Sequence, residues 1–263
     1  MAGNAVVSVR GLSCAWGENL VLRDVSFDVY EGEIFVILGE SGCGKSTLLK
    51  HLIGLREPGR GQILILGQDL GQTFGEARRR LLQRIGVTYQ NGALFGSMSV
   101  LQNVRLQLEV HTDLPGEAID MVARMKLALV GLAAHGYVLP AALSGGMQKR
   151  AAIARAMALD PAVLFLDEPS TGLDPVTSAS LDALIKELSR NLGITFVIVS
   201  HELSSIFAVA NRVIMLDKTV KGIAAEGDPR ILRDATDNPL ARRFFHPGEA
   251  GEQPIPGLST GAT

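Results

Sequence analysis

The sequence contains little cysteine, no dominant charge and no long apolar run. Its two cysteines, Cys14 and Cys43, are too few for a disulfide framework and favour a reducing compartment. The 25 lysines and arginines nearly balance the 27 aspartates and glutamates, and the net charge of -2 argues against a broadly basic, nucleic-acid-binding surface. The longest apolar runs, such as residues 194–199, are strand-length, well short of the about 20 residues that a membrane span requires.

Residues 1–10 lack a basic patch followed by an apolar run, so we expect no secretory signal. The chain also shows no internal repeat at solenoid periods and no low-complexity block. We therefore expect a protein that is soluble on its own, with any link to a membrane made through a partner or a surface patch.

Apolar residues and glycine are abundant. Hydrophobic residues make up 47% of the sequence, too many for a disordered chain, and 263 residues suffice for a sizeable core in one large domain or two small ones. The 29 glycines fall between apolar runs, as turns in an α/β protein do.

Short apolar runs alternate with helical patterns along most of the chain. Strands are predicted at residues 6–9, 21–29, 34–38, 63–66, 85–89, 163–166, 194–199 and 213–216. Helices are predicted from residue 45 and at residues 176–188 and 203–210. Within the second strand we expect one face to carry Val21, Arg23, Val25 and Phe27. The alternation favours a parallel sheet with crossover helices.

Residues 91–160 follow a helical spacing and interrupt this alternation. We expect one apolar stripe to contain Val100, Val104 and Leu108, and another to contain Ile119, Met121, Val122 and Met125. The segment is therefore predicted to be a helical insertion. The tail after Pro239 is rich in Gly, Pro and Thr toward its end, where Pro254 and Pro256 precede residues 257–263, and we expect it to be mobile.

A glycine-rich motif follows the buried strand 34–38 and precedes an apolar helix. Its residues are Gly39, Glu40, Ser41, Gly42, Cys43, Gly44, Lys45 and Ser46, followed by Thr47, and they fit G-x-x-x-x-G-K-[ST]. Such a loop brings backbone N–H groups and a helix N-terminus to phosphate oxygens. Lys45 supplies a charge for the outer phosphates, and the Ser46 hydroxyl is a natural Mg²⁺ ligand. The alternative is a glycine-rich turn that binds nothing.

Two consecutive carboxylates end the predicted strand 163–166. Because side chains alternate along a strand, Asp167 and Glu168 point to different places. We assign Asp167 to Mg²⁺ and Glu168 to polarising an attacking water. Taken alone, the pair could be a solvated strand end, but the nearby glycine motif favours the catalytic interpretation.

A third motif precedes the predicted helix 147–159. It consists of Leu143, Ser144, Gly145, Gly146, Met147 and Gln148. The serine hydroxyl and the free N–H groups at the start of the helix could bind an anion, and an ordinary N-cap is the alternative.

Together these motifs resemble those of ATP-binding cassette (ABC) ATPase subunits over residues 6–226. Residues 143–148 match the signature motif of that family, with Met147 where many members have glutamine. Gln90 matches the glutamine that opens the helical subdomain, residues 170–174 match the loop after the paired carboxylates, and His201 matches the switch histidine. Trp16 falls where the family usually has a tyrosine that stacks on adenine, and a buried core tryptophan is the alternative.

The resemblance implies an α/β fold: a P-loop NTPase (RecA-like) core with a parallel sheet, an N-terminal antiparallel β subdomain and an inserted helical subdomain. It divides a single domain into a core (residues 1–90 and 161–235), a helical subdomain (91–160) and a C-terminal tail (236–263).

The resemblance also implies a mechanism in which two copies pack head to tail. ATP and Mg²⁺ would lie between residues 39–47 of one copy and residues 144–148 of the other, with Asp174 among the nucleotide-binding residues. Glu168 would orient water, His201 would contact the γ-phosphate, and Gln90 would sense Mg²⁺ or water.

Residues 90–95, 98–104, 216–218 and 244–246 further resemble ATPases of Mce/Mla-type lipid transport systems. Those ATPases pair with integral membrane permeases and an MCE-class protein, and some systems carry a STAS-domain accessory protein. The resemblance implies a motor on the cytoplasmic face of the inner membrane that moves phospholipid or another hydrophobic substrate. Within it, Leu94, Phe95 and Met98 would anchor a permease helix, and core packing is the alternative.

Three other functions compete with this interpretation. A motor for amino-acid or other small-solute import shares every catalytic motif. A soluble ABC ATPase of translation or DNA repair would carry two cassettes or a long coiled-coil interruption, neither of which is present. A regulator without turnover is disfavoured by Glu168 and His201. The basic cluster of Arg78, Arg79, Arg80 and Arg84 is most simply a solvated helix face, and attraction to anionic lipid is the alternative.

Overall fold

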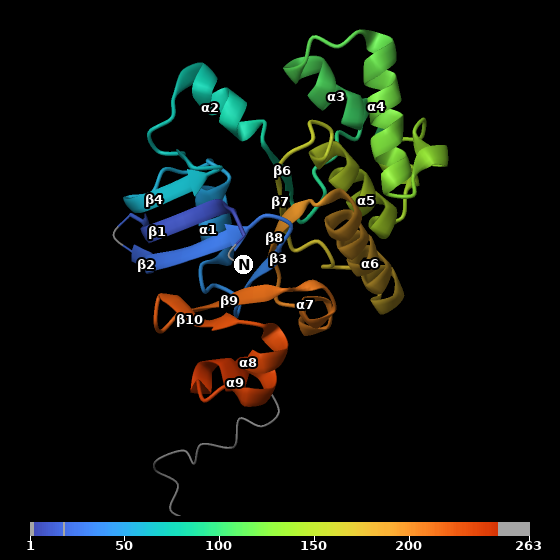
Figure 1. Cartoon of the computed structure of the whole chain (residues 1–263). Coiled ribbons are helices and arrows are strands. Elements are labelled where there is room, and N and C mark those ends of the chain that lie inside the picture. The colour runs from blue at the N-terminus through green and yellow to red at the C-terminus, as the bar shows by residue number, and fades with distance from the viewer. Residues whose placement is uncertain (1–2, 18, 247–263) are drawn as a thin grey trace, which may run out of the picture.

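The computed structural model describes residues 3–17 and 19–246, without the side chain of Trp16. The described residues form two β-sheets with helices packed around them (Figure 1). None of the helices in these ranges combines the length and the apolar character needed to cross a bilayer.

The larger sheet is formed by short apolar strands that are mostly parallel. In spatial order these are β10 (Gly222–Gly227), β9 (Arg212–Asp217), β3 (Ile34–Leu38), β8 (Thr195–Val199), β7 (Val163–Asp167) and β6 (Ile85–Thr88). All neighbours from β9 to β6 pair in parallel, and β10 is antiparallel to β9. Both β3 and β8 are buried along their whole length, as strands covered on both faces must be. The predicted parallel sheet is confirmed.

A smaller antiparallel sheet covers one face of the larger one. Its order is β2 (Asn19–Tyr30), β1 (Ala5–Trp16), β4 (Arg60–Ile65) and β5 (Gln68–Asp69). Helix α1 (Lys45–Leu52) shares a hydrophobic core with both sheets, to which it contributes Leu48, Leu49 and Leu52.

The expected alternation along β2 is wrong at one point. Leu22 is buried while Arg23 is exposed, and the buried face resumes at Val25 and Phe27. The cause is a β-bulge: Cys14 pairs with Leu22 but Leu12 pairs with Val25, so β2 carries one extra residue. Asp24, inside the bulge, has a φ of 51°.

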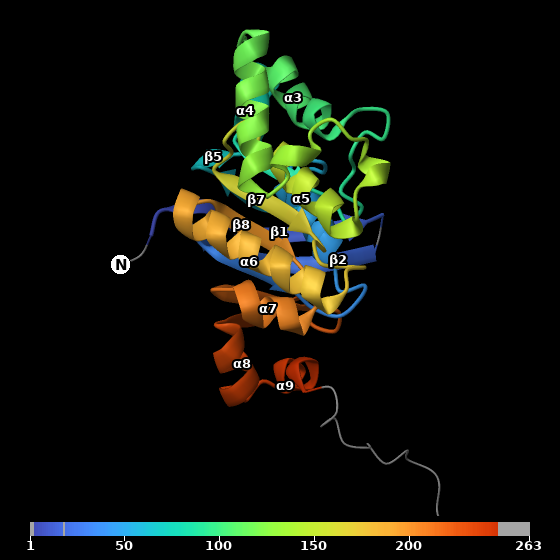
Figure 2. The same cartoon turned by 90° about the vertical axis from the view of Figure 1, so that its right-hand side faces the viewer.

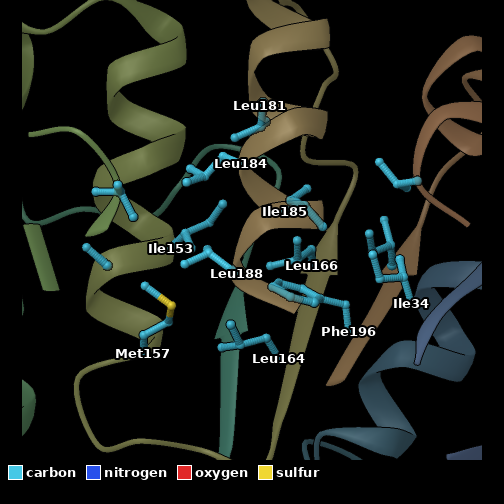
Figure 3. Close-up of a cluster of buried hydrophobic side chains, with 14 of the residues drawn as sticks. Ile34, Ile153, Met157, Leu164, Leu166, Leu181, Leu184, Ile185, Leu188 and Phe196 are labelled. Carbon is cyan, nitrogen blue, oxygen red and sulfur yellow. The ribbon is translucent and has the colours of Figure 1, made fainter. Parts of the chain in front are cut away.

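Helices α5 (Gly145–Ala156), α6 (Pro175–Leu192) and α7 (Leu203–Val209) cover the other face of the larger sheet. Figure 3 shows Ile185 of α6 beside Leu166 of β7 and Phe196 of β8, and Leu184 on the side of α6 that faces Ile153 of α5. Each such buried side chain contributes roughly 1.5–3 kcal/mol of hydrophobic free energy. This packing fixes α5 and α6 against the strands whose ends carry the candidate site.

The predicted helical insertion contains α3 (Val100–His111), α4 (Gly116–Leu129), two short 3₁₀ turns (Ala133–His135 and Pro140–Ala142) and then α5. Helices α3 and α4 lie at the opposite end of the molecule from the C-terminal helices (Figure 2). Ser99 and Gln102 form a capping box at the start of α3. The predicted stripe of Val100, Val104 and Leu108 is buried, as expected.

The second predicted stripe is wrong at Met121 and Met125, while Ile119 is buried and Val122 packs against the core. Met121 is 73% exposed and Met125 is 51% exposed, and the buried side chains of α4 include Ile119, Ala123 and Leu127. The reason is geometric: Ile119, Ala123 and Leu127 recur every four residues and share one helix face, and Met121 and Met125 lie on another.

Helix α2 (Gly75–Leu82) carries most of the basic cluster. Arg79 and Arg80 are exposed and pair with Glu76, which favours the interpretation as a solvated face. Arg78 instead donates to the backbone carbonyls of Leu70 and Gly54, so it holds α2 against the turn after α1.

The C-terminal part of the described chain forms α8 (Pro229–Ala235) and α9 (Pro239–Phe245). The expectation of a mobile tail from Pro239 is wrong for residues 239–245, because Ala241 and Phe245 are buried in the main core. The Phe245 ring lies 5.7 Å from that of Phe207 on α7. Residues 247–263 of the expected tail lie outside the described residues.

Candidate nucleotide-binding site

One open pocket forms where β3, β7 and β8 end. Its lining consists of Val21, Ser41, Gly42, Gly44, Lys45, Ser46, Thr47, Gln90, Asp167, Glu168 and His201. The carboxyl ends of parallel strands are the usual place for ligands in α/β sheets. The structure therefore brings together most of the glycine motif, both carboxylates, the glutamine and the histidine that were predicted from sequence.

The glycine loop requires glycine for two separate reasons. Gly39, Gly42 and Gly44 have φ values of 147°, 80° and 108°, a region that side chains strongly disfavour. A Cβ at Gly39 would also lie only 2.4 Å from the carbonyl oxygen of Leu216. Gly44 is the N-cap of α1 and offers no side-chain cap, which leaves N–H groups of the first helical turn available for an anion.

Lys45 folds back over this loop. Its Nζ donates to the carbonyl oxygens of Gly39 at 2.7 Å and Glu40 at 3.0 Å, and the residue is only 8% exposed. The ammonium is thus held against the loop, and Lys45 lines the pocket. The carboxylate of Glu40 faces away and pairs with Lys218 at 3.0 Å.

Cys43 is buried inside the same loop. Burial raises the pKa of its thiol, and the nearby charge of Lys45 opposes this shift only in part. A thiol with a raised pKa is a poor redox centre, so the geometry favours the interpretation of Cys43 as a small residue that fits the turn.

Glu168 and His201 form a hydrogen-bonded pair. The Nδ1 atom of His201 lies 2.8 Å from Oε1 of Glu168, and the Thr171 hydroxyl donates to Oε2 at 3.2 Å. Glu168 has a φ of 48°, an unusual conformation for a non-glycine residue. Such strain is common at functional sites, and here it accompanies a carboxylate whose two oxygens both have partners.

Asp167 is the carboxylate in this pocket that best fits a role as a cation ligand. Its Oδ1 is buried and makes no hydrogen bond to any described residue. Burial, and secondly the charge of Glu168, raise the pKa of the Asp167 carboxyl. The Ser46 hydroxyl and the Gln90 amide line the same pocket, so oxygen donors of the kind that Mg²⁺ prefers are present.

These residues alone would not saturate a metal ion. Among the described residues, no group of three or more His, Cys, Asp or Glu side chains could hold a metal. Mg²⁺ typically completes its shell with phosphate oxygens and water, so the donor set fits a nucleotide-bound Mg²⁺.

The predicted residues 144–148 and Asp174 do not line this pocket. Ser144 caps α5, with its hydroxyl accepting from the N–H of Met147 at 3.3 Å, and both Ser144 and Gly145 are exposed. Gln148 donates to the carbonyl oxygens of Pro140 and Leu143. Asp174 caps α6 by accepting from the N–H groups of residues 176 and 177. The side chain of Trp16 lies outside the described part of the chain.

Sequence reasoning missed three residues at or beside the site. Val21 lines the pocket, and Thr171 holds Glu168. Lys149 on α5 donates to the carbonyl oxygen of Gln90 and to that of Glu168. Burial lowers the pKa of Lys149, against the opposing charges of Glu168, Glu202 and Asp167. The sequence signal for Lys149 was a basic residue one helical turn after Gly146. The direction of its side chain depends on tertiary packing, so the signal did not identify its partners.

Comparisons with known proteins agree with this geometry. A family model described as "ABC transporter" matches residues 22–171. The chain is 38% identical to the probable ribonucleotide transport ATP-binding protein mkl of Mycobacterium leprae, over 94% of this chain and 70% of that protein. It is 36% identical to MlaF of Escherichia coli K12, named as an intermembrane phospholipid transport system ATP-binding protein, over 91% of this chain and 93% of that protein.

Solved structures with the same fold include cbiO1 of Clostridium perfringens, which is part of an ABC transporter complex. The two chains superpose with a TM-score of 0.80 and are 28% identical, and the match covers 86% of this chain and 90% of that one. Another is a dimeric ATP-binding cassette in a post-hydrolysis state with ADP and Pi, with a TM-score of 0.75, 29% identity and coverage of 84% and 98%. The chain therefore belongs to the ABC transporter family, as an ATP-hydrolysing cassette. The predicted family and fold are confirmed.

Proposed function

We propose that this chain is the motor subunit of a phospholipid transporter and that it works as a nucleotide-sandwich homodimer. The observation that carries the proposal is that the predicted nucleotide-binding residues lie at two separate places on the chain. The loop of residues 39–47 and the Glu168–His201 pair share one pocket, whereas the exposed serine-capped start of α5 lies outside it. A second copy, turned head to tail, could bring its own Ser144 and Gly145 to the open side of this pocket.

Each residue in the pocket then has a role that follows from its chemistry. The loop N–H groups and Lys45 would bind the phosphates, and Ser46, Asp167 and Gln90 would hold Mg²⁺, which supplies charge neutralisation at the γ-phosphate. Glu168 would orient the attacking water. His201, already 2.8 Å from Glu168, would contact the γ-phosphate and keep that carboxylate in place.

The exposed loop that follows Gln90 supports the proposal of a permease partner. Asn103, fully buried, accepts from the N–H of Phe95 and donates to the carbonyl oxygens of Phe95 and Met98. These bonds fix the loop so that Phe95 remains 49% exposed while Leu94 packs against the core. Phe95 is thus a candidate anchor for a permease helix, which would keep the chain at the cytoplasmic face of the membrane.

Phospholipid as cargo is supported by the MlaF proteins. Those of Escherichia coli and Haemophilus influenzae match over 93% and 96% of their own length, so no large part of them lacks a counterpart here. An MCE-domain protein and a STAS-domain accessory protein would complete such a system. The mkl proteins, named for ribonucleotide transport, favour a small-solute system as the second candidate.

Purification of the full chain with its native partners tests the proposal. A tagged chain is extracted from the source membranes in mild detergent, and the bound proteins and lipids are identified by mass spectrometry. The account predicts a polytopic permease, an MCE-domain protein and co-purifying phospholipid in stoichiometric amounts. A complex with a solute-binding protein and no bound lipid would contradict the lipid assignment and favour the small-solute alternative.

A further inference from the structure

Helix α5 presents two cationic side chains to the chain segment that begins at Gln90. The Arg155 guanidinium, buried at 9% exposure, donates to the carbonyl oxygens of Ala93 at 2.6 Å and Gly92 at 3.0 Å. Lys149, six residues earlier on the same helix, donates to the carbonyl oxygen of Gln90. Together they bond three of the first four backbone carbonyls of this segment to α5.

Lys149 makes a second contact that Arg155 does not make. Its Nζ also lies 3.4 Å from the carbonyl oxygen of Glu168. One ammonium therefore joins α5 to the backbone of both Gln90 and Glu168, two residues whose side chains line the nucleotide pocket. Lys149 itself is not part of that lining, and its hydrogen bonds to the site are made to these two backbone carbonyls.

The segment also packs directly on the helix. A Cβ added at Gly92 would lie 3.5 Å from the Cβ of Ala152 and 3.7 Å from the carbonyl oxygen of Gln148. Since there is no layer of side chains between them, a shift of α5 must carry residues 90–93 along with it.

The N-terminus and the side of α5 thus face different sites. Its N-terminus is the exposed Ser144–Gly145 start, which under the proposed dimer contacts the nucleotide bound by the partner, and its flank holds Gln90 and Glu168 of its own site. We propose that Lys149 is a positioning residue that couples the two ATP sites: when α5 settles on the partner's nucleotide, Lys149 aligns Gln90 and Glu168 for hydrolysis in its own chain. This inference rests on the proposed head-to-tail dimer.

The test measures ATP hydrolysis by the full chain against ATP concentration for three variants. Lys149→Met removes the ammonium and keeps the length of the side chain, and Lys149→Arg keeps a cation. The control, Lys186→Met, changes an exposed lysine on α6 outside the pocket lining. Binding of a fluorescent ATP analogue and thermal denaturation are recorded for each variant, so that loss of affinity or of folding is seen directly.

We expect Lys149→Met to lower kcat about tenfold, the effect of losing one charge-assisted contact, while ATP affinity stays within about twofold. The Hill coefficient for hydrolysis should fall from near two toward one, because two coupled sites become independent. Lys149→Arg should recover most of both values, and Lys186→Met should behave as wild type.

Unchanged kcat and Hill coefficient in a folded Lys149→Met variant would overturn the inference and leave the proposed function intact. If Lys149→Met does not fold, the Lys149→Arg variant is used instead. A folded Lys149→Arg variant with the wild-type Hill coefficient supports coupling through the cation. A Hill coefficient near one in that variant contradicts it. Absence of ATP hydrolysis in the wild-type chain would instead refute the proposed function, on which the inference depends.

Discussion

Lys45 is a buried lysine whose hydrogen bonds close the glycine loop on itself. Its ammonium donates to the carbonyl oxygens of Gly39 and Glu40 within the loop that we propose binds the phosphates of ATP. Replacing it with alanine removes a charge-assisted contact to phosphate, worth about 1.5–3 kcal/mol. We expect Lys45→Ala to weaken ATP binding by one to two orders of magnitude in isothermal titration calorimetry. Lys186→Ala is the matched control, and equal affinity of the two variants would remove Lys45 from the phosphate site.

A second residue-scale prediction concerns stability at high pH. Cys14 is fully buried, and burial raises the pKa of its thiol from 9.0 to about 11. Below pH 9.0 the thiol is protonated in both the folded and the unfolded chain, so pH has no effect through this group. Between pH 9.0 and about 11 the unfolded chain releases this proton while the folded chain retains it, so stability falls as pH rises.

The measurement is urea denaturation of wild type and Cys14→Ala across that pH window. We expect wild type to lose up to about 2–3 kcal/mol more than the variant between the two ends of the window, since the alanine cannot titrate. Parallel curves for the two proteins would show that Cys14 is not shielded from water.

At the scale of elements, the contact between β6 and α5 leaves no room for a side chain at Gly86. A Cβ there would lie 2.3 Å from the carbonyl oxygen of Ala156 and 2.4 Å from Cδ2 of Leu164. We expect Gly86→Ala to destabilise the fold by about 1–3 kcal/mol through overpacking, which thermal denaturation measures. Gly96→Ala is the control, because nothing lies within 4 Å of its Cβ position. Equal melting temperatures would mean that β6 and α5 are not packed this closely.

Elements were predictable where a local pattern decides them. The run of residues 34–38 is apolar throughout and became the fully buried β3, and the glycine motif after it needed only the strand before and the helix after. The bulge at Asp24 and the outward direction of Met121 were not predictable, because register and helix facing depend on which neighbour packs alongside. Likewise α9 is ordered by burial of Phe245 against α7, a contact between residues 38 positions apart.

The site divides in the same way. Lys45, Asp167 and Glu168 lie in local motifs whose neighbours dictate their direction, so sequence alone identified them. Lys149 donates to backbone carbonyls of segments 59 and 19 positions away, and only the folded chain reveals those partners. Thr171 donates to the carboxylate of Glu168, three residues earlier, and the bend of the loop between them sets that contact. The structure adds support for Asp167 as a cation ligand, because its buried Oδ1 has no hydrogen-bond partner among the described residues, a fact that the sequence does not contain.

At the scale of the whole molecule, the parts of the site are split between two surfaces. The pocket that contains Lys45 and Glu168 is open, and the serine cap of α5 is exposed elsewhere on the same chain. If two copies complete each other's sites, ATP must hold them together and hydrolysis must release them. Glu168→Gln preserves the shape of the side chain and removes the carboxylate charge, so we expect hydrolysis to slow by about 10²–10⁴-fold while ATP remains bound.

The molar mass of Glu168→Gln, measured by size-exclusion chromatography with light scattering, tests this most directly. We expect the mass of one chain without nucleotide, the mass of two chains with saturating ATP and Mg²⁺, and one chain again when Lys45→Ala is added to the same variant. A mass of one chain at saturating ATP, together with full hydrolysis by a strictly monomeric wild type, would contradict it.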